Sequence, residues 1–578
     1  MILQALVRYY EALAARGEVS RPGWSSVKVS YVLYLDDDGR ITQAASVMEE
    51  QERGKKKVPV PRLMTVPAPV KRTVGVEANF LCDNSGYILG VDSKGNAQRT
   101  AKCFEACKKL HNDLLGEVDS KAARAVVRFF GTWDPASAEQ DPVLSEIYDD
   151  ITGGANIVFR VDGVYAHEDI EIAKAWQRYL DSDEGKEQRV CMLTGNTAPI
   201  ATLHPSIKGI AGAQSSGASL VSFNAPSSCS YDREQGLNAP TSEYAAFAYG
   251  TALNHLIADR QYTSRIGDTT VLCWAENADT EYQSIFSAMM FGGTEKYTED
   301  DLREMTHKLC QGIVVEYDES MIDPDMDFYV LGIAPNAARL SVRFFYHNSF
   351  GTILRNIREH YERMEIVIPG YEQHQTLPLW KVMNETVNQN SRDKSPSPLL
   401  AGEMVRAILV GSPYPATLIN AIELRIRAEH DIPWRKAAII KAYYLKNTNP
   451  DVPKEVLTVS LNPESDNTAY NLGRLFSALE AVQEKANPGI NATIKDKYFN
   501  SASATPAVVF PVLINLAQKH LKKLDGGMRV YCEKQLGEIT EKIGEGFPAH
   551  LTLPQQGSFQ LGYYHQTQAR YQRKDKED

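Results

Sequence analysis

The chain has 578 residues, of which 43% are hydrophobic and 23% charged. These values exclude a disordered chain, since they provide enough apolar material for sizeable cores, and the length suggests about three or four domains at most. The formal net charge of −11 argues against a uniformly basic nucleic-acid-binding protein but leaves local basic patches open. Eight scattered cysteines do not form a disulfide framework and fit a reducing compartment.

No segment of the sequence predicts export or a membrane span. The N-terminus lacks the apolar stretch of a signal peptide, and its apolar residues recur at helical spacing. The longest apolar run, at 506–517, is shorter than the roughly 20 residues that a membrane helix needs. We therefore expect a cytoplasmic protein that does not contact a membrane.

The first 370 or so residues mix strand and helix patterns. Strands are expected at 27–35, 270–274, 328–333 and 338–346, and helices at 99–115, 121–130, 170–180, 243–258 and 283–290. The order is neither a regular βαβ alternation nor a chain of strands only. This pattern favours the α+β class.

Beyond residue 370 the strand patterns fade and helical periodicity continues to the end. Helices are expected at 400–410, 416–429, 434–447, 467–486, 506–524, 529–543 and 556–573. Short connections between them suggest a helical bundle. The predicted organisation is a mixed domain at 1–375 followed by an all-α domain at 376–578.

The most distinctive segment is a Gly/Ser/Gln-rich loop at 212–219, GAQSSGAS. It nearly fits the phosphate-binding G-x-x-x-x-G-K-[ST] loop, but Ala218 stands at the lysine position, so the main charge partner of a nucleotide is missing. Glycines with short polar side chains allow close approach to a DNA backbone or groove. The alternative is a plain tight loop between two elements.

The sequence carries no recognisable catalytic constellation. Ser215 and Ser216 lack the paired glycines of a nucleophile elbow. Cys103, Cys107 and His111 recur at helical spacing, but a zinc ion is not normally held by three ligands of one helix, so buried core residues are the better interpretation. We expect no catalytic residue, no metal and no cofactor, and keep a nuclease or another enzyme with an unrecognised site as the alternative.

Basic residues cluster in two places. The stretch 53–76 contains no acidic residue and seven basic ones, among them Lys55, Lys56 and Lys57, and its prolines keep it extended. Such an arm suits contacts to DNA phosphates; the alternative is a solvated loop. The second cluster includes Arg339 and Arg343, which lie four residues apart on an expected strand, so alternation places them on the same face.

Several long segments carry a resemblance to a known family. They are the opening MILQAL, the block from Lys71 to Gly90, the Leu193-Thr194-Gly195 tripeptide, the segment HPSIKGIAGAQSSGASLVSFN with the following QGLNAP, and FYVLGIAPNAARLSVRFFY at 328–346. On these residues the chain resembles, over essentially its whole length, the large subunit of the type I-C CRISPR surveillance complex (Cascade), the Dvulg-subtype family.

The resemblance implies a non-catalytic subunit that joins guide-RNA-bound backbone subunits. Such a subunit reads a short protospacer-adjacent motif in duplex DNA, helps to open the duplex into an R-loop with a displaced strand, and presents the complex to a helicase-nuclease. The guide then supplies sequence by base pairing while the protein reads only the short motif.

Within this framework we assign residues to two roles. Motif reading is expected from residues in or near the Gly-rich segment, since Gln and Asn can contact adenine in a bidentate manner: Lys208, Gln214, Ser215, Ser216 and Asn224. Phosphate contacts are expected from Lys55, Lys56, Lys57, Arg339 and Arg343.

The resemblance also implies that the region 456–578 is similar to a Cascade small subunit. In the family this region is expected to be made separately as well, from an internal translation start. No methionine stands near 456–459, so such a start needs a GTG or TTG codon at Val456, Leu457 or Val459. The alternative is that the region exists only as a covalent C-terminal domain.

Overall fold

The computed structural model describes twelve stretches of the chain, together with the backbone alone of Arg53, Lys56 and Glu299. These stretches are 1–53, 56–70, 72, 75–93, 96–180, 182, 187–259, 263–292, 296–372, 376–392, 394–544 and 546–571. The described chain divides into two compact units, one made essentially of 3–205 and 222–252 and the other of 206–221 and 253–578.

The first unit is built around a five-stranded sheet. Its order is β3 (Ile41–Ser46), β2 (Tyr31–Leu35), β8 (Asn156–Val161) and β7 (Cys82–Asn84), with β9 (Val164–Tyr165) also paired to β8. The central pair β2 and β8 is parallel, and the other pairs are antiparallel. Two parallel central strands need a crossover, and the segment between β7 and β8 supplies helices for it.

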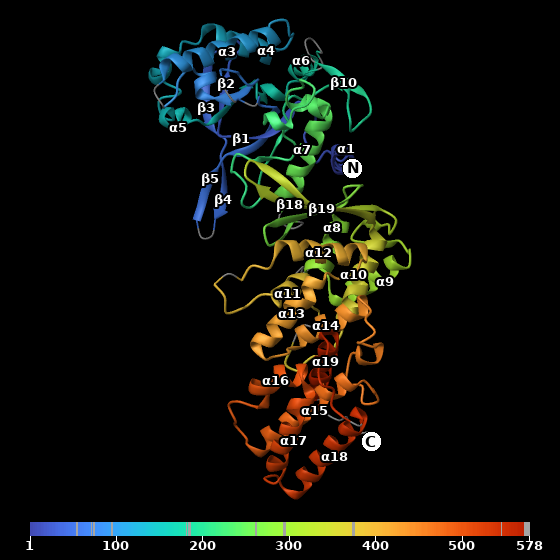
Figure 1. Cartoon of the computed structure of the whole chain (residues 1–578). Helices are drawn as coiled ribbons and strands as arrows, with labels where there is room; N and C mark the ends of the chain where they lie inside the picture. The colour runs from blue at the N-terminus through green and yellow to red at the C-terminus, as the bar shows by residue number, and fades with distance from the viewer. Residues whose placement is uncertain are drawn as a thin grey trace. The chain divides into compact units, whose positions relative to one another are not determined.

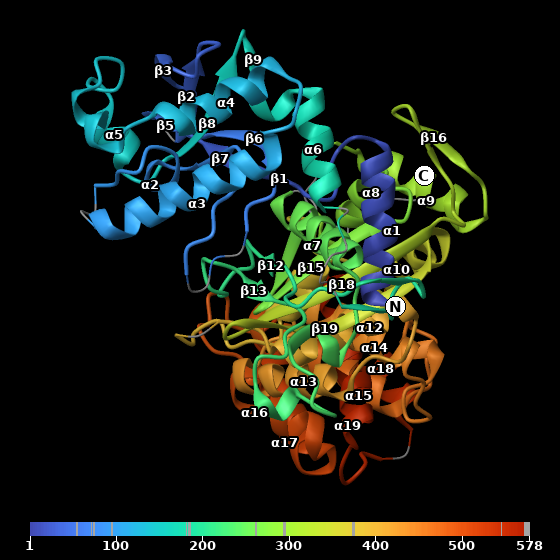
Figure 2. The same ribbon diagram turned by 90° about the horizontal axis from the view of Figure 1, so that it is seen from above.

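Helices cover one face of this sheet and a ribbon covers the other. The helices α3 (Ala97–Leu115) and α4 (Lys121–Thr132) lie side by side (Figures 1 and 2) and pack with α6 (Ile170–Leu180) over the main core. The antiparallel ribbon of β1 (Trp24–Val29) and β6 (Arg62–Pro67) encloses a smaller core against β2 and β8. The remaining elements of this unit are α1 (Ile2–Ala15), β4 (Glu49–Arg53), β5 (Lys56–Val60), α2 (Ser85–Ile88), α5 (Tyr148–Thr152), β10 (Gln188–Val190) and β11 (Thr197–Pro199).

The second unit contains a six-stranded sheet. Its order is β12 (Ser206–Ile207), β13 (Ala218–Ser219), β19 (Arg339–Ser349), β18 (Asp327–Asn336), β15 (Thr269–Ala275) and β14 (Thr263–Ile266). The pairs are antiparallel apart from the parallel bridge between β13 and β19. The helix α7 (Glu243–Ala258) begins in the first unit and ends in the second.

One face of this second sheet packs on helices that continue into an all-α region. α8 (Thr280–Phe291), α10 (Phe350–Met364) and α12 (Pro398–Val410) contact β15 and β19 directly. Beyond them lie α13 (Ala416–Glu429) and α14 (Trp434–Lys446). The other elements before the last five helices are α9 (Glu299–Cys310), β16 (Val315–Tyr317), β17 (Ser320–Ile322) and α11 (Leu379–Asn384).

Among the last five helices, four surround α15 (Thr468–Ala486), which is buried along most of its length. It contacts α16 (Ile494–Ala504), α17 (Pro506–Leu521), α18 (Gly526–Ile543) and α19 (Leu553–Ala569). The closest pair is α15 and α19, because Gly473 and Gly562 leave no side chain between the two backbones: a Cβ at Gly473 would lie 1.9 Å from the Phe559 carbonyl oxygen. Glycine is required at this crossing for that reason.

The α+β prediction is confirmed, with sheets in the N-terminal half and helices dominating the rest. The predicted strand 27–35 is wrong in one respect: it is two strands, which separate at Ser30 and pair in different sheets. The helix α16 was not predicted because few apolar residues lie in it, although its Thr493–Asp496 capping box is a readable signal. The domain boundary at 375 stays a prediction; one hydrophobic core joins residues on both sides of it.

No helix within the described ranges is both long and apolar enough to cross a bilayer.

Candidate nucleic-acid interface

The Gly-rich segment forms a hairpin loop at the edge of the second sheet. β12 pairs with β13 through Ser206↔Ser219 and Ile207↔Ala218, which leaves residues 208–217 as the loop. The far strand of this hairpin joins the sheet where Ser219 pairs with Arg339. The loop is thereby fixed at both ends to a rigid element, which is the arrangement that recognition loops need.

Glycines give the loop its tight path. The Gly217 amide donates to the Gln214 carbonyl over 2.9 Å, so Ser215 and Ser216 are the central residues of a turn. Gly217 has φ +100°, and a Cβ there would lie 3.0 Å from the Ile207 carbonyl oxygen. Gly212 has φ +82°, and a Cβ there would lie 3.2 Å from the Pro335 side chain of β18. The loop therefore lies against the turn that joins β18 to β19.

This geometry presents the predicted motif-reading side chains to solvent. Gln214, Ser215 and Ser216 are exposed at the tip, and their side chains have no hydrogen-bond partner among the described residues. Lys208 is also exposed, and its backbone amide is fixed by a 2.9 Å bond to Asn254 Oδ1. A held backbone with unsatisfied polar side chains suits the reading of base edges.

The fifth residue of the predicted set belongs to the other unit. Asn224 is exposed, and it lies in the stretch 222–252 of the first unit. Four of the five predicted residues are thus brought together on one loop, and the structure does not group Asn224 with them. Whether these residues read a motif stays a prediction.

Arg339 and Arg343 of β19 were expected on the same face of the strand, and the structure removes the basis for this expectation. The pairing of β18 with β19 shifts between Gly332 and Ile333, so Arg343 is the extra residue of a β-bulge. A bulge breaks the alternation on which the prediction rested. Arg339 lies beside the Gly-rich loop, whereas Arg343 forms a 2.9 Å ion pair with Asp268, and both side chains of that pair are partly exposed.

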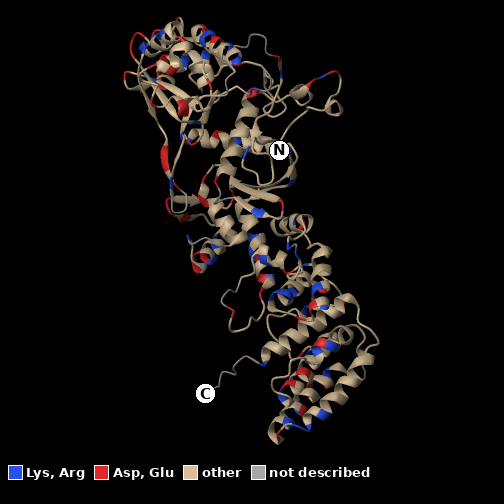
Figure 3. Cartoon of the chain, turned by 90° about the vertical axis from the view of Figure 1, so that its left-hand side faces the viewer, with Lys and Arg blue, Asp and Glu red and all other residues tan. Residues whose placement is uncertain are grey.

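The predicted basic arm is folded into two strands. Lys55 lies outside the described residues, as does the side chain of Lys56, and Lys57 is on β5. β5 pairs with β4, whose sequence is Glu-Glu-Gln-Glu-Arg, and the Lys57 Nζ lies 3.2 Å from Glu50 Oε2. Figure 3 shows acidic and basic residues close together on this hairpin. The positive charge that the sequence concentrates after residue 53 is therefore partly offset by the preceding strand.

Another cation of the same stretch has a structural role that was not predicted. Arg72 forms an ion pair with Asp83, which is 1% exposed, and its guanidinium lies 3.9 Å from the centre of the Tyr87 ring. It also donates to the Glu77 carbonyl over 2.6 Å. Arg72 thus fixes the chain around β7 and is not an accessible phosphate ligand. Its acidic partner lies eleven positions later, and sequence spacing gives no signal for such a pair.

The interpretation of Cys103, Cys107 and His111 as core residues is confirmed. Both cysteines are buried, and His111, which is 0% exposed, accepts a 3.0 Å hydrogen bond from the Leu81 amide. Burial lowers the pKa of His111 to about 4, so the ring is neutral at physiological pH. Among the described residues, no group of three His, Cys, Asp or Glu side chains is placed to hold a metal ion.

Comparison with protein families places nearly the whole chain in one of them. Residues 6–571 fit the model of a family described as CRISPR-associated protein (Cas_Csd1). No curated protein matches the chain. The match spans both units and includes the Gly-rich hairpin loop and the last five helices.

Proposed function

Because the chain belongs to the Cas_Csd1 family of CRISPR-associated proteins, we propose that it is the large subunit of a type I-C RNA-guided DNA surveillance complex. In this role it joins guide-RNA-bound backbone subunits in the cytoplasm. It reads the protospacer-adjacent motif in duplex DNA, supports R-loop formation around the displaced strand, and helps to recruit a helicase-nuclease. The chain itself is non-catalytic and needs no cofactor.

One observation carries the proposal of motif reading. The hairpin loop 208–217 presents Gln214, Ser215 and Ser216 to solvent on a tight turn, without side-chain partners among the described residues. Arg339 stands at the strand to which this hairpin is joined. The tip thus offers polar groups that can pair with base edges, and the neighbouring strand carries an arginine, a residue type that contacts phosphates.

The test is binding of the assembled complex to duplexes that match the guide and carry randomised bases beside the target. We expect wild-type complex to select one short motif. The Gln214→Ala variant should lose about 1–3 kcal/mol of discrimination if Gln214 contacts a base. Gln518→Ala, which removes an exposed glutamine of α17, is the matched control and should leave selection unchanged.

Two outcomes would contradict this proposal. If the wild type and the Gln214→Ala variant bind all flanking sequences equally, the loop does not read a motif. If the purified chain cleaves DNA in the presence of Mg²⁺ or Mn²⁺, the subunit is an enzyme, and the alternative of a nuclease replaces the non-catalytic role.

A further inference from the structure

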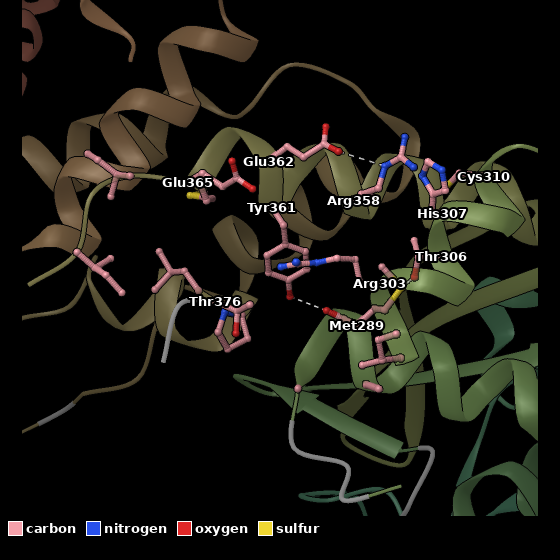
Figure 4. A pocket seen from close by; sticks show the side chains of 18 of the residues that line it. Met289, Arg303, Thr306, His307, Cys310, Arg358, Tyr361, Glu362, Glu365 and Thr376 are labelled. Carbon is pink, nitrogen blue, oxygen red and sulfur yellow. Dashed lines mark hydrogen bonds and ion pairs between the residues drawn. The ribbon is translucent and has the colours of Figure 1, made fainter. Parts of the chain in front are cut away.

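A large, partly open cavity is lined by residues of the second unit and by none of the Gly-rich loop. Its volume is about 1280 Å³, which is more than a typical small-molecule site needs. Its walls are the facing sides of α9 and α10, the end of α8, and two extended segments at 366–368 and 376–378. Figure 4 shows the side chains of this cavity.

Helical spacing brings the polar groups of the cavity into two rows. On α9, Thr306 and His307 lie three and four residues after Arg303. On α10, Tyr361 and Glu362 lie three and four residues after Arg358. Tyr361 donates its hydroxyl proton to the Met289 carbonyl at the end of α8, as Figure 4 shows. This hydrogen bond holds the Tyr361 ring between α10 and the end of α8.

The segment 366–368 lines the cavity and has main-chain groups that the rest of the described chain does not use. The Val367 amide donates to the Val459 carbonyl over 2.7 Å, and the Val367 carbonyl accepts a hydrogen bond from Tyr564. In an extended chain the main-chain groups of the neighbouring residues point to the opposite edge. Those groups, on Ile366 and Ile368, have no hydrogen-bond partner among the described residues.

Burial makes these unused groups significant. Ile366 is 7% exposed, and Leu377 of the second extended segment is 1% exposed and likewise lacks a main-chain partner within the described chain. Ile368 and Leu377 each precede a proline, which keeps them extended rather than helical. Amide and carbonyl groups that lose contact with water are nearly always paired, so a ligand that fills the cavity as a strand would pair with these main-chain groups.

The charges of the lining select the kind of ligand. The cavity is lined by two arginines and two glutamates, Arg303, Arg358, Glu362 and Glu365, so their charges cancel. A nucleic-acid groove requires an excess of positive charge, which this lining does not provide. Arg358 is 3.2 Å from Glu362, whereas Arg303 has no ion-pair partner among the described residues. A carboxylate is the natural partner for that guanidinium.

We propose that this cavity binds an extended segment of a partner protein by strand addition. Its main chain hydrogen-bonds to Ile366 and Ile368, one large apolar side chain enters the cavity, and a neighbouring carboxylate pairs with Arg303. Main-chain bonds supply affinity in this mode while the side-chain pocket supplies specificity. The flexible side chains of Met289 and Met364 in the lining adapt to such a side chain.

The experiment begins with a displayed library of short random peptides selected on the full chain. We expect enrichment of sequences with a large apolar residue near an Asp or Glu. A synthetic peptide of the enriched sequence is then compared with versions that are N-methylated at single positions. Loss of a main-chain donor should weaken binding by about tenfold at alternate positions only.

A charge exchange provides the second test. Arg303→Glu should weaken binding of the acidic peptide by about tenfold or more. A peptide in which Lys replaces the acidic residue should bind this variant again. Lys308→Glu is the matched control, because Lys308 is on the same helix, does not line the cavity, and should leave binding unchanged. The N-methylated peptides test the proposal without any protein variant, should Arg303→Glu fail to fold.

Three results would overturn the proposal. They are the absence of a common enriched sequence, binding that is insensitive to both N-methylation and Arg303→Glu, and displacement of the peptide by a single-stranded DNA oligonucleotide whose own binding depends on Arg303. None of these depends on whether the Gly-rich loop reads a motif.

Discussion

Glu423 is a carboxyl group that the fold buries within the helical region of the second unit. It is 6% exposed, and only its Oε2 has a partner, a 2.8 Å hydrogen bond from Gln560. Burial raises the pKa of Glu423 to about 7, against the opposing effect of the Gln560 bond. A group whose folded-state pKa is raised stabilises the protein fully below its unfolded pKa and loses that contribution as the pH rises through the folded value.

We therefore predict that Glu423→Gln raises thermal stability at pH 8 and changes it little at pH 4.5. The gain at pH 8 is at most about 3 kcal/mol, because each pKa unit corresponds to about 1.4 kcal/mol. Thermal unfolding at both pH values measures the effect. Glu541→Gln, at an exposed position of α18, is the control. Equal shifts for the two variants at the two pH values would show that burial of Glu423 carries no cost.

At the same scale, sequence patterns predict the exposed loop better than the ion pairs. The glycines and short polar residues of 212–219 determine a tight exposed turn locally, so the tip carrying Gln214 was predictable. The pairs Arg72–Asp83 and Arg343–Asp268 join different elements, and only the fold brings them together. The sequence therefore predicts those parts of the site that depend on local backbone conformation. It does not predict those that depend on tertiary contacts.

The β4–β5 hairpin shows the same limit at the scale of an element. The sequence of β5 predicts a phosphate-binding arm, but strand pairing places Glu49, Glu50 and Glu52 of β4 opposite it. Cross-strand pairs of opposite charge attract each other, and so the acidic strand competes with DNA for the lysines.

We predict that alanine at Lys55, Lys56 and Lys57 weakens binding of the complex to all duplexes without changing motif preference. The slope of log K against log salt should fall by about 0.9 for each lost phosphate contact. Glu49→Gln together with Glu50→Gln is the opposite control and should strengthen binding, because it releases Lys57. An unchanged slope in the triple variant would place the hairpin away from DNA.

The α15–α19 crossing provides a test of packing at the element scale. Gly473→Ala places a methyl group 1.9 Å from the Phe559 carbonyl oxygen, and overpacking of this kind costs about 1–3 kcal/mol or more. Gly537→Ala in α18, where a Cβ meets no atom within 4 Å, should instead stabilise the helix by up to about 1 kcal/mol. Denaturant unfolding distinguishes the two. Equal effects would contradict the close crossing.

At the scale of the whole molecule, the last five helices are not separated from the rest by packing. α19 contacts α14, Gln560 bonds to Glu423 of α13, and Val459 bonds to Val367. A free fragment from 456 onwards would expose the surfaces that make these contacts. Sequence periodicity predicted four of these five helices, all except α16, but it did not show that one core joins them to the preceding helices.

We nevertheless predict a free C-terminal species of about 120 residues, a typical domain size. Expression of the intact gene followed by native mass spectrometry of the purified complex should detect it. Synonymous recoding of Val456, Leu457 and Val459 to codons that cannot initiate translation is the control, and should remove the species while leaving the full-length chain. An assembled complex without such a species would show that the region exists only as part of the whole chain.

The Gly-rich hairpin loop is the part of the chain that we propose reads a short motif in duplex DNA. The most direct measurement is the affinity of the assembled complex for guide-matched duplexes whose flanking bases are varied. We predict that affinity depends on a short motif beside the target. Gln214→Ala should reduce this dependence by about 1–3 kcal/mol, and Gln518→Ala should leave it unchanged. Motif dependence that is identical in the wild type and in the Gln214→Ala variant would contradict the role assigned to Gln214, and affinity that is independent of the flanking bases would contradict the claim as a whole.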